Sequence, residues 1–455
     1  MRGTLTKSTP GLYPRLLEEV LLPAGDLLLR TSFMRHLKAW REIQWLRTSD
    51  LRDRQRQGLE RVLRFATTRI AYYQRLGIRL AGDPFDDLAR FPIVGKPAIK
   101  AEPDAFVLGP RSRLVCEKSS GSSGVQGAVY MTREEASHAQ AIQTLWWEWA
   151  GFRLGFKYFQ RGITPERRFV KRIKDILLRT TYVSAYQLNE QEARTWLLYL
   201  RRNPHRHMGG YASSLYVFAR LAKDLAIDDI RFDSVISWGD KLFQHYRESI
   251  EMQFHCRVFD TYGCTEGLMI AGQCERGTYH IMTPHVRLEL LDDNDRPVKP
   301  GHLGRVVVTR LDNFSMPLIR YALGDLAEAA DPSLLCDCGR QFPILARVVG
   351  RETDVVRTPS GKHMVVHFFT GIMEHFSEIR QFRVVQRTPE NIEIEYIPDI
   401  NFSPTVLARV RQTIHARLGE PFPILFQEVS YIAPTPSGKP EIVKLELTPR
   451  VPSQA

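Results

Sequence analysis

The alternation of helix-like and strand-like segments between residues 132 and 261 constrains the fold of this chain most. Thr132-Arg-Glu-Glu135 has the order of a capping box, so a helix should begin there and carry Trp146, Trp147 and Trp149 near its end. Further helices are predicted over 213–225 and about 242–254, and strands over 234–237 and 257–261. Helices that alternate with strands imply right-handed crossovers and a largely parallel sheet, so the predicted class is α/β.

The segments on either side of this region have other patterns. Apolar residues such as Leu16, Val20, Leu59 and Leu63 recur at helical spacing within residues 1–100, which predicts a helical N-terminal part. We expect it to be a cap on the large domain, with a membrane-facing amphipathic layer as the alternative. Residues 101–348 should form the α/β core, which includes a β-rich segment over 286–311.

A last unit is expected over residues 349–455. It begins near Gly350, with alternating strands around 380–397 and a helix over 404–418. About a hundred residues suffice for a small domain, so we expect a C-terminal α+β domain.

Composition excludes several classes of protein. The 455 residues are 43% hydrophobic and 25% charged, which is typical of a globular chain and not of a disordered one. The 63 Lys and Arg exceed the 51 Asp and Glu by 12, but the excess is spread along the chain, so we expect no nucleic-acid partner. No apolar run approaches the ~18 residues of a transmembrane helix, and no leader pattern is recognisable, so a cytoplasmic location is expected.

A Ser/Gly run over 119–127 is a candidate phosphate-binding loop. Glycines let several backbone N–H groups converge on an anion, and the hydroxyls add donors. The run is not a Walker A motif, because no Gly-Lys-Ser/Thr follows it. Taken alone, a flexible linker is an equal alternative.

Four further motifs follow in order. Tyr262-Gly-Cys-Thr-Glu266 comes after a predicted parallel strand, where ligands bind in open α/β sheets. Arg320-Tyr-Ala-Leu-Gly-Asp325 is expected to place a carboxylate after a strand, suited to a ribose diol. Gly350-Arg-Glu-Thr-Asp354 opens the last unit, and Pro436-Ser-Gly-Lys439 presents a lysine on a turn.

This order of motifs resembles the adenylate-forming superfamily, and most closely the phenylacetate-CoA ligase family with its relatives in capsule and exopolysaccharide gene clusters. The resemblance runs from roughly residue 40 to 450. It implies a large adenylating domain and a small mobile C-terminal domain. It also implies activation of a carboxylic acid by ATP to an acyl-adenylate, then transfer to the thiol of CoA as the small domain rotates.

The resemblance further implies a role for each motif. The phosphate loop would bind the β and γ phosphates of ATP through Ser119, Ser120, Gly121, Ser122, Ser123 and Gly124. Thr265 would bind the α-phosphate, Glu266 would bind Mg²⁺, and Lys439 would bridge the carboxylate and the AMP phosphate. The physics agrees, because two anions meet in this reaction and a lysine and a magnesium ion neutralise the developing charge.

Other residues would line the nucleotide and acid pockets. The remaining nucleotide candidates are Gly239, Asp240, Lys241, Tyr262, Asp325, Arg340 and Arg351, with Asp325 on the ribose hydroxyls. The candidates for the acid pocket are Trp238, Tyr211, Cys264 and Gly267. Aromatic residues in this set hint at an aromatic or planar acid.

The chain departs from the family pattern at two positions. Many members have Lys after the second loop glycine, where this chain has Val125 and then Gln126. In the Gly350 motif, Thr353 stands where a family acidic residue often serves as the hinge. The first departure bears on the rate of activation and the second on the position of the hinge.

The cysteines supply a separate signal. Cys274 and His280 are separated by five residues, and Cys336-Asp-Cys338 follows later. Three thiolates and one imidazole suit a closed, structural zinc site, and the family branch carries a comparable set. Free thiols in a reducing cytosol are the alternative. Cys264 has no evident base beside it and is not expected to be a nucleophile.

Three alternative interpretations remain open at this point. The acyl group could pass to a carrier-protein thiol or an amine, which would leave the same ATP motifs. The chain could be a non-catalytic nucleotide-binding protein of a polysaccharide cluster, which Val125 and Thr353 favour and Glu266, Asp325 and Lys439 oppose. The N-terminal basic helices could be a peripheral membrane anchor. The sequence indicates neither the acid nor the oligomeric state.

Overall fold

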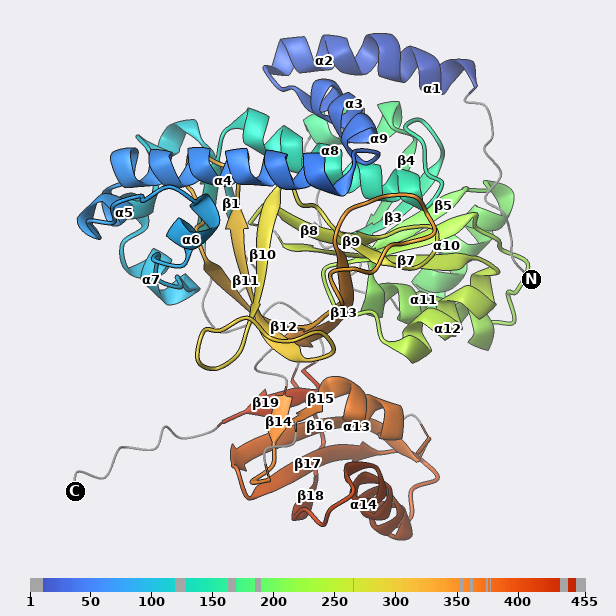
Figure 1. The fold of residues 1–455 in the computed structure, drawn as a ribbon. Coiled ribbons are helices and arrows are strands. Elements are labelled where there is room, and N and C mark those ends of the chain that lie inside the picture. Colours follow the sequence, from blue (N-terminus) through green and yellow to red (C-terminus); the bar gives the residue numbers. More distant parts are fainter. Residues whose placement is uncertain are drawn as a thin grey trace, which may run out of the picture. The chain divides into compact units, whose positions relative to one another are not determined.

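The computed structural model describes most of the chain, as residues 11–118, 128–162, 169–184, 190–264, 266–351, 355–360, 363–373, 375–376, 378–433 and 441–446. The described residues form two compact units (Figure 1). Unit 1 holds the described residues up to Leu323 and Glu328–Val348. Unit 2 holds Gly324–Ala327 and the described residues from Val349 onward.

Helices fill the N-terminal part of unit 1, as predicted. They are α1 (Leu12–Leu16), η1 (Leu17–Leu21), α2 (Leu22–Leu29), α3 (Phe33–Ile43), α4 (Thr48–Arg69), α5 (Ala71–Arg75), α6 (Pro84–Leu88) and α7 (Lys96–Ala101), with 3₁₀ turns at Pro103–Phe106 and Arg111–Arg113. On α4, the longest, Leu59, Val62 and Leu63 are buried while the charged residues between them are exposed. The amphipathic spacing therefore directs one face of the helix into the core.

An 11-stranded sheet forms the centre of unit 1. Its strands are β3 (Tyr158–Gly162), β4 (Thr180–Ser184), β5 (His207–Tyr211), β6 (Ser234–Trp238), β7 (Arg257–Cys264), β8 (Leu268–Gln273), β9 (Tyr279–Ile281), β10 (Val286–Leu291), β11 (Leu303–Arg310), β12 (Tyr321–Ala329) and β13 (Ile344–Arg351). Their order is β10-β11-β12-β13-β9-β8-β7-β6-β5-β3-β4. Strands β4, β3, β5, β6 and β7 pair in parallel, which confirms the predicted α/β class. The pairs β7–β8, β8–β9, β9–β13 and β10–β11 are antiparallel.

Helices cover both faces of the parallel strands (Figure 1). They are α8 (Arg133–Trp149), α9 (Phe169–Leu177), α10 (Glu190–Arg202), α11 (Ala212–Asp224) and α12 (Gln244–Phe254). Side chains of α3 and α8 pack with Tyr158 and Ile236 on one face, and side chains of α10, α11 and α12 pack with Phe159 and Val235 on the other. This division follows from the alternation of side chains along a strand.

The start of α8 is fixed as the sequence predicts. The Thr132 hydroxyl accepts a hydrogen bond from the Glu135 N–H at 3.1 Å, and the Glu135 carboxylate accepts one from the Thr132 N–H at 2.7 Å. This reciprocal pair is a capping box. Immediately before it, β1 (Val115–Lys118) and β2 (Ala128–Met131) form an antiparallel hairpin.

Unit 2 is an α+β domain, as expected. Its elements are β14 (Val355–Arg357), β15 (His363–Val365), α13 (Val366–Met373), β16 (Ile379–Thr388), β17 (Asn391–Pro398), α14 (Thr405–Leu418), β18 (Ile424–Glu428) and β19 (Val443–Leu445). The four-stranded sheet has the order β18-β17-β16-β19, and β14 pairs with β15. Val406, Val410 and Ile414 give α14 one buried face.

Two local expectations need correction. The strand predicted over 257–261 is longer: β7 pairs in parallel with β6 as far as Asp260 and continues to Cys264, because its second half pairs with β8. Asp325 lies within β12, not after a strand. Arg320, with a φ of 47°, supplies the turn directly before β12, so the strand begins at Tyr321 and runs through the motif.

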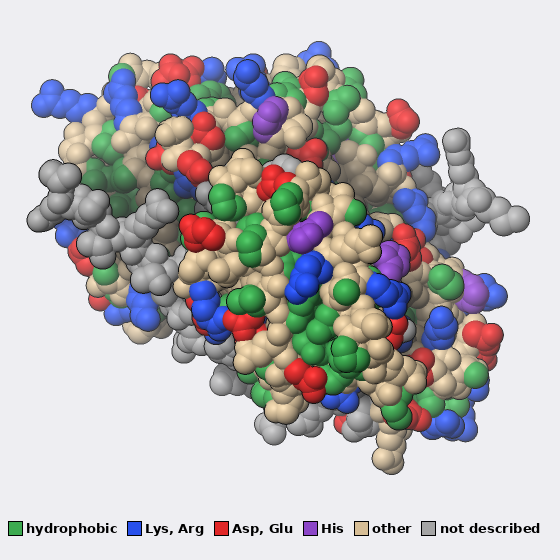
Figure 2. All heavy atoms as spheres, turned by 90° about the horizontal axis from the view of Figure 1, so that it is seen from below, with side chains coloured by type: hydrophobic (Ala, Val, Ile, Leu, Met, Phe, Trp, Pro, Cys, Tyr) green, Lys and Arg blue, Asp and Glu red, His purple; other side chains and the backbone are tan. Residues whose placement is uncertain are grey.

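Charged side chains are distributed over the surface, as the spread of Lys, Arg, Asp and Glu along the sequence predicts. On the face drawn in Figure 2, basic, acidic and apolar side chains are interspersed. Among the helices of the described residues, none has both the length and the hydropathy that crossing a bilayer requires.

Candidate functional site

Three neighbouring parallel strands, β5, β6 and β7, carry several of the predicted site residues at their carboxyl ends, which lie along one side of the sheet. Tyr211 at the end of β5 lies opposite Trp238 at the end of β6, and Ser237 lies opposite Asp260 on β7. The segments that continue from these ends are therefore neighbours, although they are separated by more than twenty residues in the sequence. Ligands of open α/β sheets bind outside the carboxyl ends of the strands, so this edge is the candidate active site.

Gly239 turns the chain sharply at the end of β6. It has a φ of +80°, and a Cβ built on it would lie 2.4 Å from the Tyr211 ring. Only glycine permits both this backbone conformation and this close approach. The structure thus places two of the predicted pocket residues in direct contact.

Asp240 is held by the N-terminus of α11. Its carboxylate accepts hydrogen bonds from the Ser213 N–H at 3.2 Å and from the Ser213 hydroxyl. The neighbouring Lys241 ammonium lies 5.8 Å from the centre of the Phe243 ring. These contacts orient the loop after β6, and the predicted contacts of both residues with a nucleotide stay predictions.

Aromatic rings stack beside Trp238 at the end of β6. The Trp147 ring of α8 stacks on Trp238 and on Tyr158, with ring centroids 5.8 Å and 5.0 Å away and interplanar angles of 22° and 24°. Gly209 makes room for the stack, since a Cβ there would lie 1.8 Å from the Tyr158 hydroxyl. Trp147 and Tyr158 were not among the predicted pocket residues, because aromatic residues on a helix or at a strand start more often signal core packing.

Glu266, the predicted magnesium ligand, is buried beside a lysine. The Lys96 ammonium lies 3.6 Å from one carboxylate oxygen, and the Tyr321 hydroxyl donates a hydrogen bond to it at 3.3 Å. Val94 forms backbone hydrogen bonds with Arg320 and Ala322, and these bonds place Lys96 at the start of α7 close to Glu266. The sequence analysis missed Lys96, because no local pattern relates it to a residue 170 positions away.

Burial explains why Cys264 is not a nucleophile. Removal from water raises the pKa of its thiol well above the usual range, and the negative charge of Glu266 raises it further. The thiol therefore stays protonated near neutral pH. This agrees with the expectation that Cys264 is not a nucleophile, and its predicted place beside the acid pocket stays a prediction.

The Arg310 guanidinium packs against the turn that follows Glu266. Gly267 has a φ of +75°, and a Cβ there would lie 2.5 Å from Nη1 of Arg310. Arg310 is fully buried, and its guanidinium donates to Asp312 at 2.8 Å and to the Glu135 carbonyl at 3.0 Å. The Glu266–Gly267 turn therefore packs directly on a buried charged pair.

His285 links the same pair to the next strand. Its Nδ1 bonds to the Asp312 carboxylate, and its Nε2 accepts from the Met269 N–H at 3.2 Å. His138 adds a second contact to Asp312 at 3.3 Å and accepts from the Trp40 indole at 2.8 Å. We call the set Arg310, Asp312, His285 and His138 the buried charge network.

Burial and charge set the ionisation of this network. Burial lowers the pKa of His138 to about 3, so its imidazole is neutral at physiological pH. Burial opposes ionisation of Asp312, but His285, His138 and Arg310 outweigh it, and the pKa of that carboxyl falls below its usual range. The network therefore holds a carboxylate against a guanidinium.

Four predicted ligands of a metal meet elsewhere in unit 1. The donor atoms of Cys274, His280, Cys336 and Cys338 all lie within 4.8 Å of one another. The Cys274 and Cys336 sulfurs are 3.7 Å apart, and the Cys338 sulfur lies 3.2 Å from His280 Nε2. The predicted convergence of these residues is confirmed, and we call them the cysteine cluster.

Surrounding groups orient the cysteine cluster. His280 Nδ1 faces the Phe342 carbonyl at 3.4 Å, which directs Nε2 toward the sulfurs. The N–H groups of Arg276 and Arg340 donate to the Cys274 and Cys338 sulfurs at 3.3 and 3.4 Å. Hydrogen bonds from Cys274, from His280 and from the backbone N–H of Arg340 lower the pKa of the Cys338 thiol, so a thiolate is favoured there.

Arg340 belongs to the surroundings of this cluster. Its guanidinium donates to Gln44 at 3.0 Å and to Glu275 at 2.7 Å, and it lies between the rings of Trp45 and Trp149. These contacts favour a structural role, and the predicted contact with phosphate or ribose stays a prediction.

Comparisons with known proteins show what the whole chain is similar to. No protein-family model matches the chain. Protein CapK of Staphylococcus aureus is 22% identical over 434 residues, 91% of this chain and 93% of that protein. Phenylacetate-coenzyme A ligase of Thermus thermophilus is 23% identical over 330 residues, 69% of this chain and 73% of that protein.

A solved structure shares the fold. 2-Hydroxyisobutyryl-CoA ligase, in the postadenylation state with an acyl-AMP, superposes with a TM-score of 0.69 at 17% identity over 88% of this chain and 90% of that chain. The chain is therefore similar in sequence to a phenylacetate-coenzyme A ligase and similar in fold to 2-hydroxyisobutyryl-CoA ligase. The predicted fold class is confirmed by this likeness.

Several residues that carry superfamily motifs lie outside the described residues. They are the phosphate loop with Val125 and Gln126, as well as Thr265, Thr353 and Lys439. The Arg351 side chain is likewise outside them, and Asp325 clusters with unit 2. Their predicted roles stay predictions.

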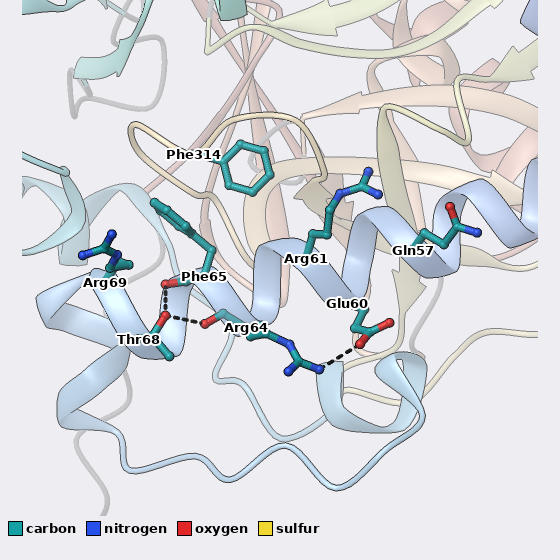
Figure 3. A pocket seen from close by; sticks show the side chains of 8 residues that line it. All are labelled: Gln57, Glu60, Arg61, Arg64, Phe65, Thr68, Arg69 and Phe314. Carbon is teal, nitrogen blue, oxygen red and sulfur yellow. Dashed lines mark hydrogen bonds and ion pairs between the residues drawn. The ribbon is translucent and has the colours of Figure 1, made fainter.

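A surface hollow on α4 is separate from the predicted site residues. It has a volume of about 650 Å³ and is lined by Gln57, Glu60, Arg61, Arg64, Phe65, Thr68, Arg69 and Phe314 (Figure 3). Arg64 pairs with Glu60 at 2.9 Å, and Thr68 donates to the Arg64 carbonyl at 2.8 Å. None of the residues predicted from sequence lines this hollow, so we do not assign it to the site.

The buried charge network predicts a large cost for one substitution. Asp312→Asn should lower the free energy of unfolding by about 3 kcal/mol, because it leaves the Arg310 guanidinium buried without its charge partner. Asp295→Asn, which breaks a more exposed pair with Arg305, is the matched control and should cost less than about 1 kcal/mol. Equal losses in urea titrations of the two variants would contradict the importance of the network.

Proposed function

We propose that the protein uses ATP to activate a carboxylic acid as an acyl-adenylate and then transfers the acyl group to the thiol of CoA. The observation that carries this proposal is that Tyr211, Trp238–Lys241 and Tyr262–Cys264 lie at or directly beyond the carboxyl ends of the parallel pairings among β5, β6 and β7. The similarity to phenylacetate-coenzyme A ligase and to 2-hydroxyisobutyryl-CoA ligase supports the same chemistry.

The first step joins two anions. A carboxylate oxygen attacks the α-phosphorus of ATP, and pyrophosphate leaves with the bonding electron pair. We infer that Lys439 stabilises the charge that develops between the two groups, and that Glu266 holds the magnesium ion that neutralises the phosphates. Lys96, adjacent to Glu266, would keep that carboxylate ionised and in place.

The second step exchanges one leaving group for another. The thiol of CoA loses its proton and attacks the acyl carbonyl, a thioester forms, and AMP leaves with the former carboxylate oxygen. A carrier-protein thiol or an amine would react at the same carbon with the same balance of atoms. The aromatic stack of Trp238, Trp147 and Tyr158 supports an aromatic or planar acid.

A screen for pyrophosphate release tests the proposal. Aryl, fatty and amino acids are supplied with ATP, and each is measured with and without CoA. We expect release that depends on the acid and a thioester only when CoA is present. A non-catalytic nucleotide-binding protein would bind ATP without releasing pyrophosphate for any acid, and that result would overturn the proposal.

The role of the C-terminal lysine gives the first kinetic prediction. Lys439→Ala should leave ATP binding nearly unchanged but slow adenylate formation about a hundredfold or more, because the charge acts mainly in the transition state. Lys444→Ala, a nearby lysine that pairs with Glu446 on the surface, is the control and should retain the rate. Equal rates of pyrophosphate release for wild type and Lys439→Ala would refute this role.

Glu266 gives a second prediction. Glu266→Gln keeps the shape of the side chain but removes its charge, so the magnesium concentration for half-maximal activity should rise severalfold. Glu60→Gln, an exposed carboxylate on α4, should leave the magnesium titration unchanged. If the two variants titrate alike, the magnesium ion is held elsewhere.

We also propose that the cysteine cluster holds a structural zinc ion. Tetrahedral Zn–S bonds of about 2.3 Å place two sulfurs roughly 3.8 Å apart, close to the 3.7 Å between Cys274 and Cys336. His280 Nε2 faces the same centre. Such an ion would tie the β8–β9 turn to the segment before β13 and would perform no chemistry.

Metal analysis tests this zinc site. Purified protein should carry about one zinc per chain, and Cys336→Ser or Cys338→Ser should lose the metal and lower the melting temperature. Cys116→Ser and Cys256→Ser are the controls, because both cysteines lie outside the cluster. Protein prepared without chelator that contains no zinc would remove the proposal.

A further inference from the structure

The helical segment Leu12–Leu29 has apolar side chains on both of its sides. On the inner side Leu17 is fully buried, and Tyr13, Leu21 and Leu22 pack against the same core. On the outer side Leu12, Leu16, Val20, Leu27, Leu28 and Leu29 are exposed, with Leu27 and Leu28 at 84% and 83%. A contiguous group of exposed apolar side chains marks a surface that binds a partner or a membrane.

Helix α9 exposes a second apolar face. Its apolar residues lie on one side of the helix, because Ile173, Ile176 and Leu177 come four, seven and eight residues after Phe169. Phe169 and Ile176 are 76% and 75% exposed. The cations Lys171, Arg172 and Lys174 lie between these positions in the sequence and are also exposed.

The two helical segments are in contact. The Tyr13 hydroxyl donates to the Leu177 carbonyl at 2.7 Å, and the Arg179 guanidinium lies 4.1 Å from the centre of the Tyr13 ring. Together their outer side chains make up ten of the 21 exposed large apolar side chains among the described residues. We call these ten the apolar outer face, and Figure 1 shows α1 and α2 at the outside of unit 1.

Positive charge borders the apolar outer face. In the sequence, residues 167–179 contain six cations, Arg167, Arg168, Lys171, Arg172, Lys174 and Arg179, and one acid, Asp175. On the first segment Arg15, Arg30 and the acidic Glu19 are exposed, so the excess of positive charge lies on the side of α9. Amphipathic helices with apolar residues on one face and cations beside them bind in the headgroup region of anionic bilayers.

We propose that the apolar outer face docks on an anionic lipid bilayer, with both helical segments lying in the plane of the interface. A symmetric contact that sets α9 of one copy against α9 of a second copy is disfavoured, because it would place the cations of the two helices against each other. The proposal does not depend on the proposed reaction.

Vesicle flotation tests the docking of the full chain. Wild type should float with vesicles of phosphatidylcholine mixed with phosphatidylglycerol, bind pure phosphatidylcholine much less, and lose binding as salt rises. Two pairs of substitutions, Leu27→Glu with Leu28→Glu and Phe169→Glu with Ile176→Glu, should each weaken binding about tenfold or more. Lys171→Glu with Arg172→Glu should weaken binding to the anionic vesicles specifically.

Matched controls separate docking from unfolding. Ile400→Glu with Leu425→Glu alters two exposed apolar side chains of unit 2 and should leave flotation unchanged. All variants should keep the wild-type melting temperature and, without vesicles, the wild-type rate of pyrophosphate release. The proposal is overturned if wild type fails to float, if the Glu pairs float like wild type, or if sedimentation shows a dimer that the same pairs dissociate.

Discussion

The parallel pairing of β5, β6 and β7 is the constraint on which the rest of the structure depends. Its register sets Tyr211 beside Trp238 and brings the end of β7 to the same edge. A slip of one residue would reverse the face of every side chain on a strand, so the apolar cores on both sheet faces enforce this register. The candidate site is thus a consequence of how the sheet is packed.

Two polar clusters support the part of unit 1 beyond β7. The buried charge network joins the turn at Gly267 to α8 and to the segment after β11, through Arg310 and its partners. The cysteine cluster joins the β8–β9 turn to the segment before β13. Both clusters therefore tie together segments that are far apart in the sequence.

Local patterns predicted most of the fold, and long-range contacts account for what they missed. The capping box at Thr132, the helices α11, α12 and α14, and the convergence of the cysteine cluster were all readable from spacing or from the family resemblance. Lys96 beside Glu266 could not be predicted, because the pair forms only when α7 meets β12. The position of Asp325 inside β12 was missed because the turn at Arg320 uses a left-handed conformation that its sequence does not signal.

The central claim is that the acid attacks the α-phosphorus of ATP, and isotope transfer tests it most directly. An accepted acid labelled with oxygen-18 in its carboxylate is incubated with the protein, ATP and CoA, and the products are analysed by mass spectrometry. Our account predicts one labelled oxygen in AMP and none in pyrophosphate, because the carboxylate oxygen leaves with the adenylate. Label in inorganic phosphate, with ADP as the nucleotide product, would show attack on the γ-phosphorus and would contradict the account.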